Sequence, residues 1–223
     1  MKLMKLNDNI YHSDYEELRD RPVLGYIKGE NFSVVIDAGH SKKHIEEFYE
    51  LLKANNLVLP KLTIITHWHW DHSFAIHSVS GLVLAERRTY DILNNVIKDF
   101  DSQKYIDMDI HIKNEYQDQE MIIKNADITF NDNISINNGT YNIEVFHVTS
   151  PHCDDCCLIL IKEAKVLFIG DSICGKYPDW IVDKKLMQEL INIIINIDFD
   201  ISIGGHWDNM SKQELISYLE SEL

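Results

Sequence analysis

Residues 67–72 read His-Trp-His-Trp-Asp-His, which places three imidazoles and one carboxylate within six positions. Imidazole and carboxylate are ligand types that suit zinc, iron and manganese. His67 and His69 lie two positions apart directly after the apolar run KLTIIT, and in extended backbone such side chains project to the same side. Asp71 and His72 follow a predicted bend. The spacing therefore predicts that the first pair binds one cation and that the second pair faces another.

Two cations need more ligands than one motif supplies, and three further segments place donors after predicted strands. His147 and His152 follow the run YNIEVF. Asp171 follows KVLFIG, and His206 follows ISIGG. Open α/β sheets bind ligands at the carboxyl ends of their strands. We therefore expect the four segments to converge on one metal site.

The elements that must position these donors are strands mixed with helices, which predicts an α+β or layered α/β fold. The apolar patterns predict a hairpin within 22–39 and helices at 41–54 and 186–197. A further helix is marked by Ile92, Val96 and Phe100, and a last one is capped by Ser211 with Glu214. Strands are predicted at 61–67, 81–85, 128–130, 134–136, 141–148, 156–161, 165–170 and 201–205. Residues 101–125 are polar and have no clear assignment. No repeat or linker divides the chain, so we predict a single domain over 1–223.

Composition excludes several classes of partner. The chain has 21 basic and 36 acidic residues, a net charge of −15, and this field repels nucleic-acid phosphates and acidic membranes. We therefore expect a small-molecule substrate, with no nucleic-acid or membrane partner. The start, MKLMKLNDNI, lacks the apolar segment of a signal peptide, so a cytoplasmic location is expected and the four cysteines are not expected to form a disulfide framework.

The ordered set HWHWDH, SPHCDD, FIGDS and GGHWD resembles the metallo-β-lactamase superfamily of metal-dependent hydrolases, from the strand SVVIDAG onward. The resemblance implies a four-layer αββα sandwich with a dinuclear metal site between its sheets. The implied ligands are His67, His69 and His152 for one metal, Asp71, His72 and His206 for the second, and Asp171 as the bridge. His152 is preferred to His147 because Ser150-Pro151-His152 matches the family's usual Pro-Gly-His, with proline in place of glycine.

The implied activity follows from these ligands. They suit two divalent metal ions, with zinc first and iron or manganese as alternatives. Two cations about 3.5–4 Å apart lower the pKa of a bridging water and clamp the developing oxyanion. We expect a metal-bridging hydroxide to attack a small ester, thioester, lactone or amide-like substrate. Asp71 would orient that hydroxide and carry a proton to the leaving group.

The chain differs from known members of the superfamily in three features, which narrows the activities that the resemblance implies. Lactonases of the superfamily carry a tyrosine near position 174, where this chain has Cys174. The best-known β-lactamases carry a metal-binding cysteine where this chain has Asp171. Glyoxalase II relatives have a long helical region after the last ligand, whereas 17 residues follow His206. The alternatives kept are a phosphodiesterase of the same fold and an iron-containing redox or sulfur-related protein, although diiron flavoproteins of this fold typically carry glutamate where His69 stands.

Other residues near the motifs receive lesser roles. Cys153 and Cys174 are expected close to the metals, whereas Cys156 and Cys157 are expected to be small apolar strand residues. His147 is expected, at most, to support a ligand. Four histidines are expected at the surface or as caps: His12, His40, His44 and His77. The four tryptophans are expected to pack around the site, and residues 101–125 are expected to cover it.

Overall fold

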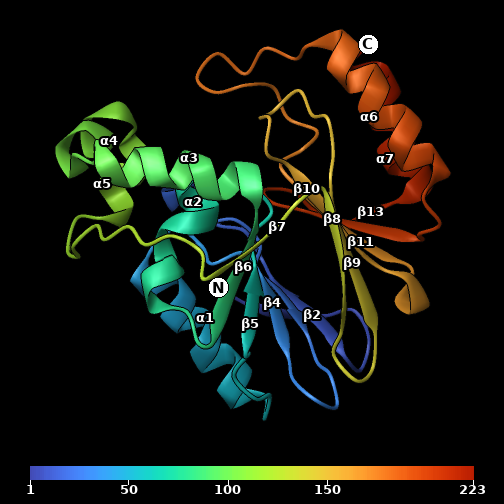
Figure 1. Cartoon of the computed structure of the whole chain (residues 1–223), viewed down its shortest axis with the longest axis horizontal. Helices are drawn as coiled ribbons and strands as arrows, with labels where there is room; N and C mark the ends of the chain where they lie inside the picture. Colours follow the sequence, from blue (N-terminus) through green and yellow to red (C-terminus); the bar gives the residue numbers. More distant parts are fainter.

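Two β-sheets lie face to face in the computed structural model, which describes residues 1–223 (Figure 1). The seven-stranded sheet runs in chain order through β1 (Leu3–Lys5), β2 (Ile10–Ser13), β3 (Gly25–Ile27), β4 (Val34–Ile36), β5 (Leu62–Ile64), β6 (Leu82–Glu86) and β7 (Ile128–Phe130). The six-stranded sheet has the order β13-β12-β11-β10-β9-β8, formed by β8 (Asn133–Asn137), β9 (Asn142–His147), β10 (Cys157–Ile161), β11 (Val166–Gly170), β12 (Ile201–Gly204) and β13 (Met210–Ser211).

Helices cover the outer face of each sheet. The helices of the chain are α1 (Lys42–Ala54), α2 (Trp70–Ser73), α3 (Arg87–Lys98), α4 (Ser102–Met108), α5 (Ile110–Glu115), α6 (Lys184–Asn196) and α7 (Lys212–Ser221), with 3₁₀ turns η1 (Glu17–Arg19), η2 (Phe74–Ser78) and η3 (Lys162–Ala164). Side chains of α1 and α3 pack on the first sheet, and those of α6 and α7 pack on the second. The predicted four-layer αββα sandwich is therefore confirmed. No helix is long and apolar enough to cross a membrane.

The layers follow from the period-two pattern of the strands. In β4, Val34 and Ile36 enter the core between the sheets, while Val35 faces the α1 side. In β11, Phe168 enters the same central core, and Leu167 faces α6 and α7. Alternate side chains of a strand point to opposite faces, so strands that are buried on both faces read as continuous apolar runs.

Most predicted elements are present, with changes at their ends. The hairpin of β3 and β4 is antiparallel, Ser41 caps α1, and Ser211 with Glu214 forms the capping box of α7. Helix α3 ends at Lys98, so the prediction that Phe100 continues it is wrong. Phe100 instead packs in the apolar cluster under α4 and α5. The single-domain assignment stays a prediction.

Residues 101–125, unassigned from the sequence, form α4 and α5 and a following loop. A buried ion pair anchors them. The Arg21 guanidinium donates through Nε and Nη2 to Glu115 at 2.9 and 3.0 Å, and a third bond of 2.9 Å runs from Nη1 to Glu47. Ser41 also donates to Glu115. These bonds tie η1, α1 and α5 together beside the donor segments.

Parallel pairing brings the donor segments to one edge. Strands β4 and β5 run parallel, as do β11 and β12, so their carboxyl ends coincide within each sheet. His67 and His69 follow β5 in a turn, Asp171 directly follows β11, and His206 follows β12. The strand-end placement predicted from the sequence is therefore confirmed, although β5 ends at Ile64, earlier than expected.

The Arg21–Glu115 pair gives a test of the fold. Both side chains are almost fully buried, so Glu115→Gln leaves a buried guanidinium without its main counter-charge. We expect the free energy of unfolding, measured by urea denaturation, to fall by about 3 kcal/mol. Asp118→Asn, which removes an exposed partner of Lys43 in the same segment, is the control and should leave the midpoint unchanged. Equal midpoints for the two variants would contradict the anchoring role.

Candidate metal centre

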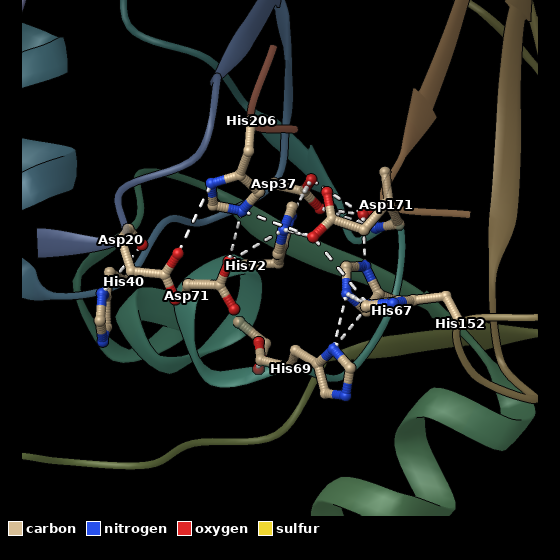
Figure 2. Close-up of polar contacts among 12 residues, drawn as sticks. Asp20, Asp37, His40, His67, His69, Asp71, His72, His152, Asp171 and His206 are labelled. Atoms are coloured by element: carbon tan, nitrogen blue, oxygen red, sulfur yellow. Dashed lines mark hydrogen bonds and ion pairs between the residues drawn. The ribbon is translucent and has the colours of Figure 1, made fainter. Parts of the chain in front are cut away.

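Three histidine nitrogens point at one another in the first donor cluster. Nε2 of His67 lies 3.1 Å from Nδ1 of His69, and Nε2 of His152 lies 3.3 Å from the His67 atom and 2.8 Å from the His69 atom (Figure 2). In a tetrahedral zinc site with 2.0–2.1 Å bonds, neighbouring ligand atoms lie about 3.3–3.4 Å apart. The separations are therefore close to those that a bound cation needs. Sγ of Cys153 joins the cluster, whose four donor atoms all lie within 4.8 Å of one another.

Burial keeps His67 and His69 of the first cluster neutral. Burial is the main reason that the pKa of His67 lies well below its ordinary value, and neighbouring histidines add to the effect. Burial likewise lowers the pKa of His69 to about 3, and His152 adds to this shift. Neutral imidazole is the form that ligates a metal, so the surroundings prepare these rings for coordination.

The second donor cluster combines carboxylates with imidazoles: Asp71, His72, Asp171 and His206. Oδ2 of Asp71 lies 2.9 Å from Nε2 of His206 and 3.1 Å from Nε2 of His72. Oδ2 of Asp171 lies 3.4 Å from each of the same two nitrogens. All four side chains thus converge on one small volume (Figure 2).

The second cluster has a strongly negative potential. Burial opposes protonation of His206, yet Asp171 and Asp71 outweigh it and raise its pKa to about 9. Burial also opposes charge on His72, but Asp71 and Asp171 hold its pKa well above the ordinary value. The same imidazolium charges lower the pKa of Asp171 despite its burial. A site that binds protons this firmly is also one that attracts a cation.

Asp171 lies between the two clusters. Its Oδ2 is 3.9 Å from Nε2 of His152 in the first cluster, besides its contacts in the second. Two buried ligand atoms of the second cluster, His72 Nε2 and Asp171 Oδ1, form no hydrogen bond within the protein. A Cβ at Gly205 would lie 2.0 Å from Oδ1 of Asp171, so only glycine leaves room for this carboxylate. Both donor sets therefore fit divalent metal ions.

Asp37 supports the ligands and had no role in the sequence prediction. Its carboxylate accepts from Nδ1 of His72 at 2.8 Å, and also from the backbone N and Oγ1 of Thr66 at 2.7 and 2.9 Å. Thr66 Oγ1 lies 3.1 Å from Nδ1 of His67, so Asp37 reaches both clusters. Its φ of 63° places it in the left-handed region, where a non-glycine residue is strained. The sequence signal that could have identified Asp37 is its position directly after the apolar run of β4, just as Asp171 directly follows β11.

Further bonds orient the other ligands. Nδ1 of His152 faces the carbonyl oxygen of Gly175 at 2.9 Å, and Ser150 Oγ accepts from the His152 backbone N at 3.0 Å. Asp155, which is fully buried, accepts from the backbone N of Trp68 at 2.8 Å and so fixes the turn between His67 and His69. Partners of this kind set the tautomer and direction of metal-binding histidines.

Asp20 approaches the site from η1. Its Oδ1 lies 3.6 Å from Nδ1 of His206. Burial, and then the charge of Asp71, raise the pKa of Asp20 to about 6. Asp20 had no sequence signal, because η1 meets the donor segments only in the folded chain.

A hollow of about 450 Å³ opens over the second cluster. Asp71, Asp171 and His206 form part of its wall, together with His69 from the first cluster. Its lining residues are Tyr15, Glu17, Asp20, His69, Trp70, Asp71, Asp171, Cys174, Tyr177, Trp180, His206 and Trp207. Three of the four tryptophans expected around the site are therefore at its wall, and no lysine or arginine is.

The remaining histidines do not all behave as expected. His12, His40 and His44 are buried, so the expectation that they lie at the surface is wrong. Nδ1 of His44 accepts from the backbone N of His40 at 3.1 Å, behind the site. His147 stays outside both clusters, and its Nε2 faces the carbonyl oxygen of Asp154 at 2.7 Å.

The cysteines divide largely as predicted. Cys156 and Cys157 are buried in apolar surroundings, but Cys156 precedes β10 and is not a strand residue as expected; Cys174 lines the hollow. Cys153 Sγ lies 3.2 Å from Cys156 Sγ, but no third donor joins this pair into a separate metal cluster. Burial raises the pKa of the Cys174 thiol, which disfavours a thiolate role for it.

Comparison with known families decides the identity. A model of the metallo-beta-lactamase superfamily matches residues 23–206, which include every predicted ligand. The chain belongs to the metallo-β-lactamase superfamily. It is therefore a hydrolase of this superfamily, and the family implies divalent metal ions at the two donor clusters. No curated protein matches the chain.

Solved structures of the superfamily share the fold at low sequence identity. A metallo-beta-lactamase from Pontibacter korlensis is 16% identical with a TM-score of 0.70, and the match covers 99% of this chain and 98% of that one. The DIM-1 metallo-beta-lactamase is 17% identical with a TM-score of 0.68, covering 99% and 95%. The sec-alkylsulfatase Pisa1 from Pseudomonas sp. has a TM-score of 0.77 at 12% identity, and the match covers 99% of this chain but 40% of that one. These likenesses establish the fold.

The support that Asp37 gives to the ligands is testable through metal binding. Asp37→Asn keeps the side-chain size and tolerates the left-handed backbone, but places an amide against His72 or Thr66. We expect zinc affinity, measured by competition with a chromophoric chelator, to fall about 10- to 100-fold. Asp179→Asn, at an exposed position, should bind zinc as the wild type does. An unchanged affinity in Asp37→Asn would show that the His72 tautomer does not depend on this carboxylate.

Buried His44 predicts a pH dependence of stability. Burial is the main cause that holds its pKa well below 6.5, and Arg21 and His40 add to it. The unfolded chain takes up a proton as the pH falls below 6.5 while the folded chain does not, so His44 stabilises the fold above this pH and the contribution is lost below it. In metal-free protein, we expect His44→Asn to make the loss of unfolding free energy between pH 7 and pH 5 shallower, by at most about 1.4 kcal/mol per pH unit.

The asparagine keeps an acceptor near the position of Nδ1, and the slope is compared rather than the absolute stability. His77→Asn, at a partly exposed position, is the control and should keep the wild-type slope. An identical slope in all three proteins would argue against a neutral buried His44.

Proposed function

We propose that this enzyme is a dinuclear metal-dependent hydrolase that cleaves a small ester, thioester, lactone or amide-like substrate. One observation carries the proposal: two donor clusters of metal-ligand geometry meet at the Asp171 carboxylate. On this proposal His67, His69 and His152 hold one metal, and Asp71, His72 and His206 hold the second. Zinc is the metal that these donors suit best, with iron and manganese compatible.

The chain's own residues supply orientation and proton transfer. When bound, two divalent cations supply a Lewis acid for the scissile group and make water nucleophilic at neutral pH. Asp71 lies at the wall of the hollow, within hydrogen-bonding distance of His206 and His72. These bonds, set against burial, hold its pKa well below the ordinary value. The ionised carboxylate is thus placed to accept a proton from the attacking water and pass it to the leaving group.

The charge of the hollow favours a neutral carbonyl substrate over a phosphodiester or a sulfate ester. Glu17 and Asp20 line the hollow beside the metal ligands, and no lysine or arginine is present in its wall. Away from the metal ions themselves, an anionic substrate would meet these two carboxylates without a cationic side chain to bind it. The net charge of −15 acts in the same direction at longer range, which also supports the absence of a nucleic-acid partner.

Activity of metal-loaded protein tests the proposal. Protein reconstituted with zinc, manganese or iron(II) is assayed on acetate esters, thioesters, lactones, anilides and bis(p-nitrophenyl) phosphate. We expect hydrolysis of a carboxylic acid derivative that rises with metal content up to two ions per chain. Asp71→Asn should lower kcat about 10²-fold or more. Asp179→Asn is the control and should keep wild-type kcat.

Three outcomes would reverse the proposal. Cleavage of the phosphodiester alone would assign the enzyme to the phosphodiesterases. Oxygen consumption by the iron-loaded protein with a thiol, without hydrolysis, would favour the redox alternative. Fewer than one metal per chain after reconstitution would remove the basis for any metal-dependent step.

A further inference from the structure

A second hollow of about 370 Å³ lies beside the first. It shares His69, Trp70 and Tyr177 with the first hollow, and it also reaches His152 and Cys153. The first hollow therefore opens on the Asp71–His206 cluster and the second on the His69–His152 cluster. Because His69 lines both, one molecule bound at the donor clusters has access to both hollows.

The inner wall of the second hollow is largely aromatic. Trp68 and Trp70 pack edge to face with ring centroids 6.4 Å apart, and Trp70 and Tyr177 do so at 5.0 Å. Tyr105 and Met108 of α4 complete the wall. Tyr105 is held by Phe74 at 5.2 Å, so the side of the hollow formed by α4 rests on the core.

The charged groups of this hollow lie at its rim and balance one another. Asp99, Asp101, Lys104 and Lys176 are all exposed. The two carboxylates and two ammonium groups give no net preference for an anion or a cation. An aromatic wall with few polar groups favours an uncharged, apolar occupant, and the volume is that of a small-molecule site.

We infer that the second hollow binds an apolar arm of the substrate, an aryl or medium-chain alkyl group attached to the scissile bond. The inference rests on the proposed hydrolase function and specifies its substrate class. The other arm lies in the first hollow, where Glu17 and Asp20 favour an uncharged or cationic group. The preferred substrate is thus amphipathic, with its reacting carbonyl at His69 and the metal ligands.

Chain-length dependence of the reaction tests the inference. Metal-loaded enzyme is assayed on N-acetylcysteamine thioesters from acetyl to octanoyl, which keep a small uncharged leaving group. S-benzyl thioacetate, whose leaving thiol is about as acidic as N-acetylcysteamine, places the apolar arm on the leaving side instead. We expect kcat/KM to rise about fourfold for each buried methylene in the acyl series, or to rise at least tenfold for the S-benzyl ester over the acetyl thioester.

Met108→Trp fills the hollow and provides the matched variant, because Met108 is 42% exposed and its replacement leaves the core intact. We expect it to lower the ratio of kcat/KM for the preferred long or aryl substrate to kcat/KM for the acetyl thioester at least tenfold. Met4→Trp, at an exposed methionine on β1, should change neither. Equal rates across both substrate series, or no effect of Met108→Trp on the preferred substrate, would overturn the inference and leave the hydrolase function standing.

A binding measurement distinguishes failure of the inferred apolar site from failure of the proposed hydrolase function. The probe is 1-octanol, which has no hydrolysable bond. In protein labelled with ¹³C at the methionine methyl groups, we expect 1-octanol to shift the NMR signal of Met108 saturably. If no ester, thioester, lactone or anilide is cleaved, the proposed function fails, and the Met108 signal alone tests the apolar site. A saturable shift then supports an apolar-arm site, and an unmoved signal overturns it.

Discussion

The structure depends on the need to bring lone-pair donors together in a buried volume where they repel one another. Three imidazole nitrogens lie 2.8–3.3 Å apart in the first cluster, and two carboxylates face two imidazoles in the second. His72 Nε2 lies 3.1 and 3.4 Å from the Asp71 and Asp171 carboxylates without forming a hydrogen bond, and Asp171 Oδ1 also has no hydrogen-bond partner. Burying such groups unpaired is costly, so a bound cation in each cluster is the arrangement that relieves it. Asp171 lies between the two clusters, where its one carboxylate can contact a cation in each.

The scaffold resists this repulsion through bonds on the far side of each ligand. Asp37 is the centre of the support, because it holds His72 directly and His67 through Thr66. It also fixes the start of the turn after β5 by accepting from the Thr66 backbone. Ligand geometry and sheet geometry are therefore coupled. A substitution at the end of β4 would therefore alter the geometry of both donor clusters, although it changes none of the predicted ligands.

On the proposed function, the elements that choose the substrate differ in part from those that hold the ligands. The predicted ligands lie in α2 and in the segments after β5, β9, β11 and β12, whereas η1, α4 and the segment around Tyr177 form the rest of the hollow walls. The Arg21–Glu115 pair joins η1 to α5 and so links the two walls. This division allows one metal centre to serve different substrates in one superfamily, because loops and added helices vary while strand ends stay fixed.

The sequence by itself determined the layered fold and the strand–donor segments, and the seven residues predicted as ligands lie together in the two donor clusters. The reason is local: apolar runs of period two mark buried strands, and donors directly after them must lie at a sheet edge. The tertiary structure alone decided what Asp37, Asp20 and Asp155 do, that His40 and His44 are buried, and that α4, within the unassigned segment 101–125, forms a wall of the second hollow. These features depend on contacts such as Arg21 with Glu115, 94 positions apart. Local periodicity carries no information about such partners, because only the packed layers bring them within reach.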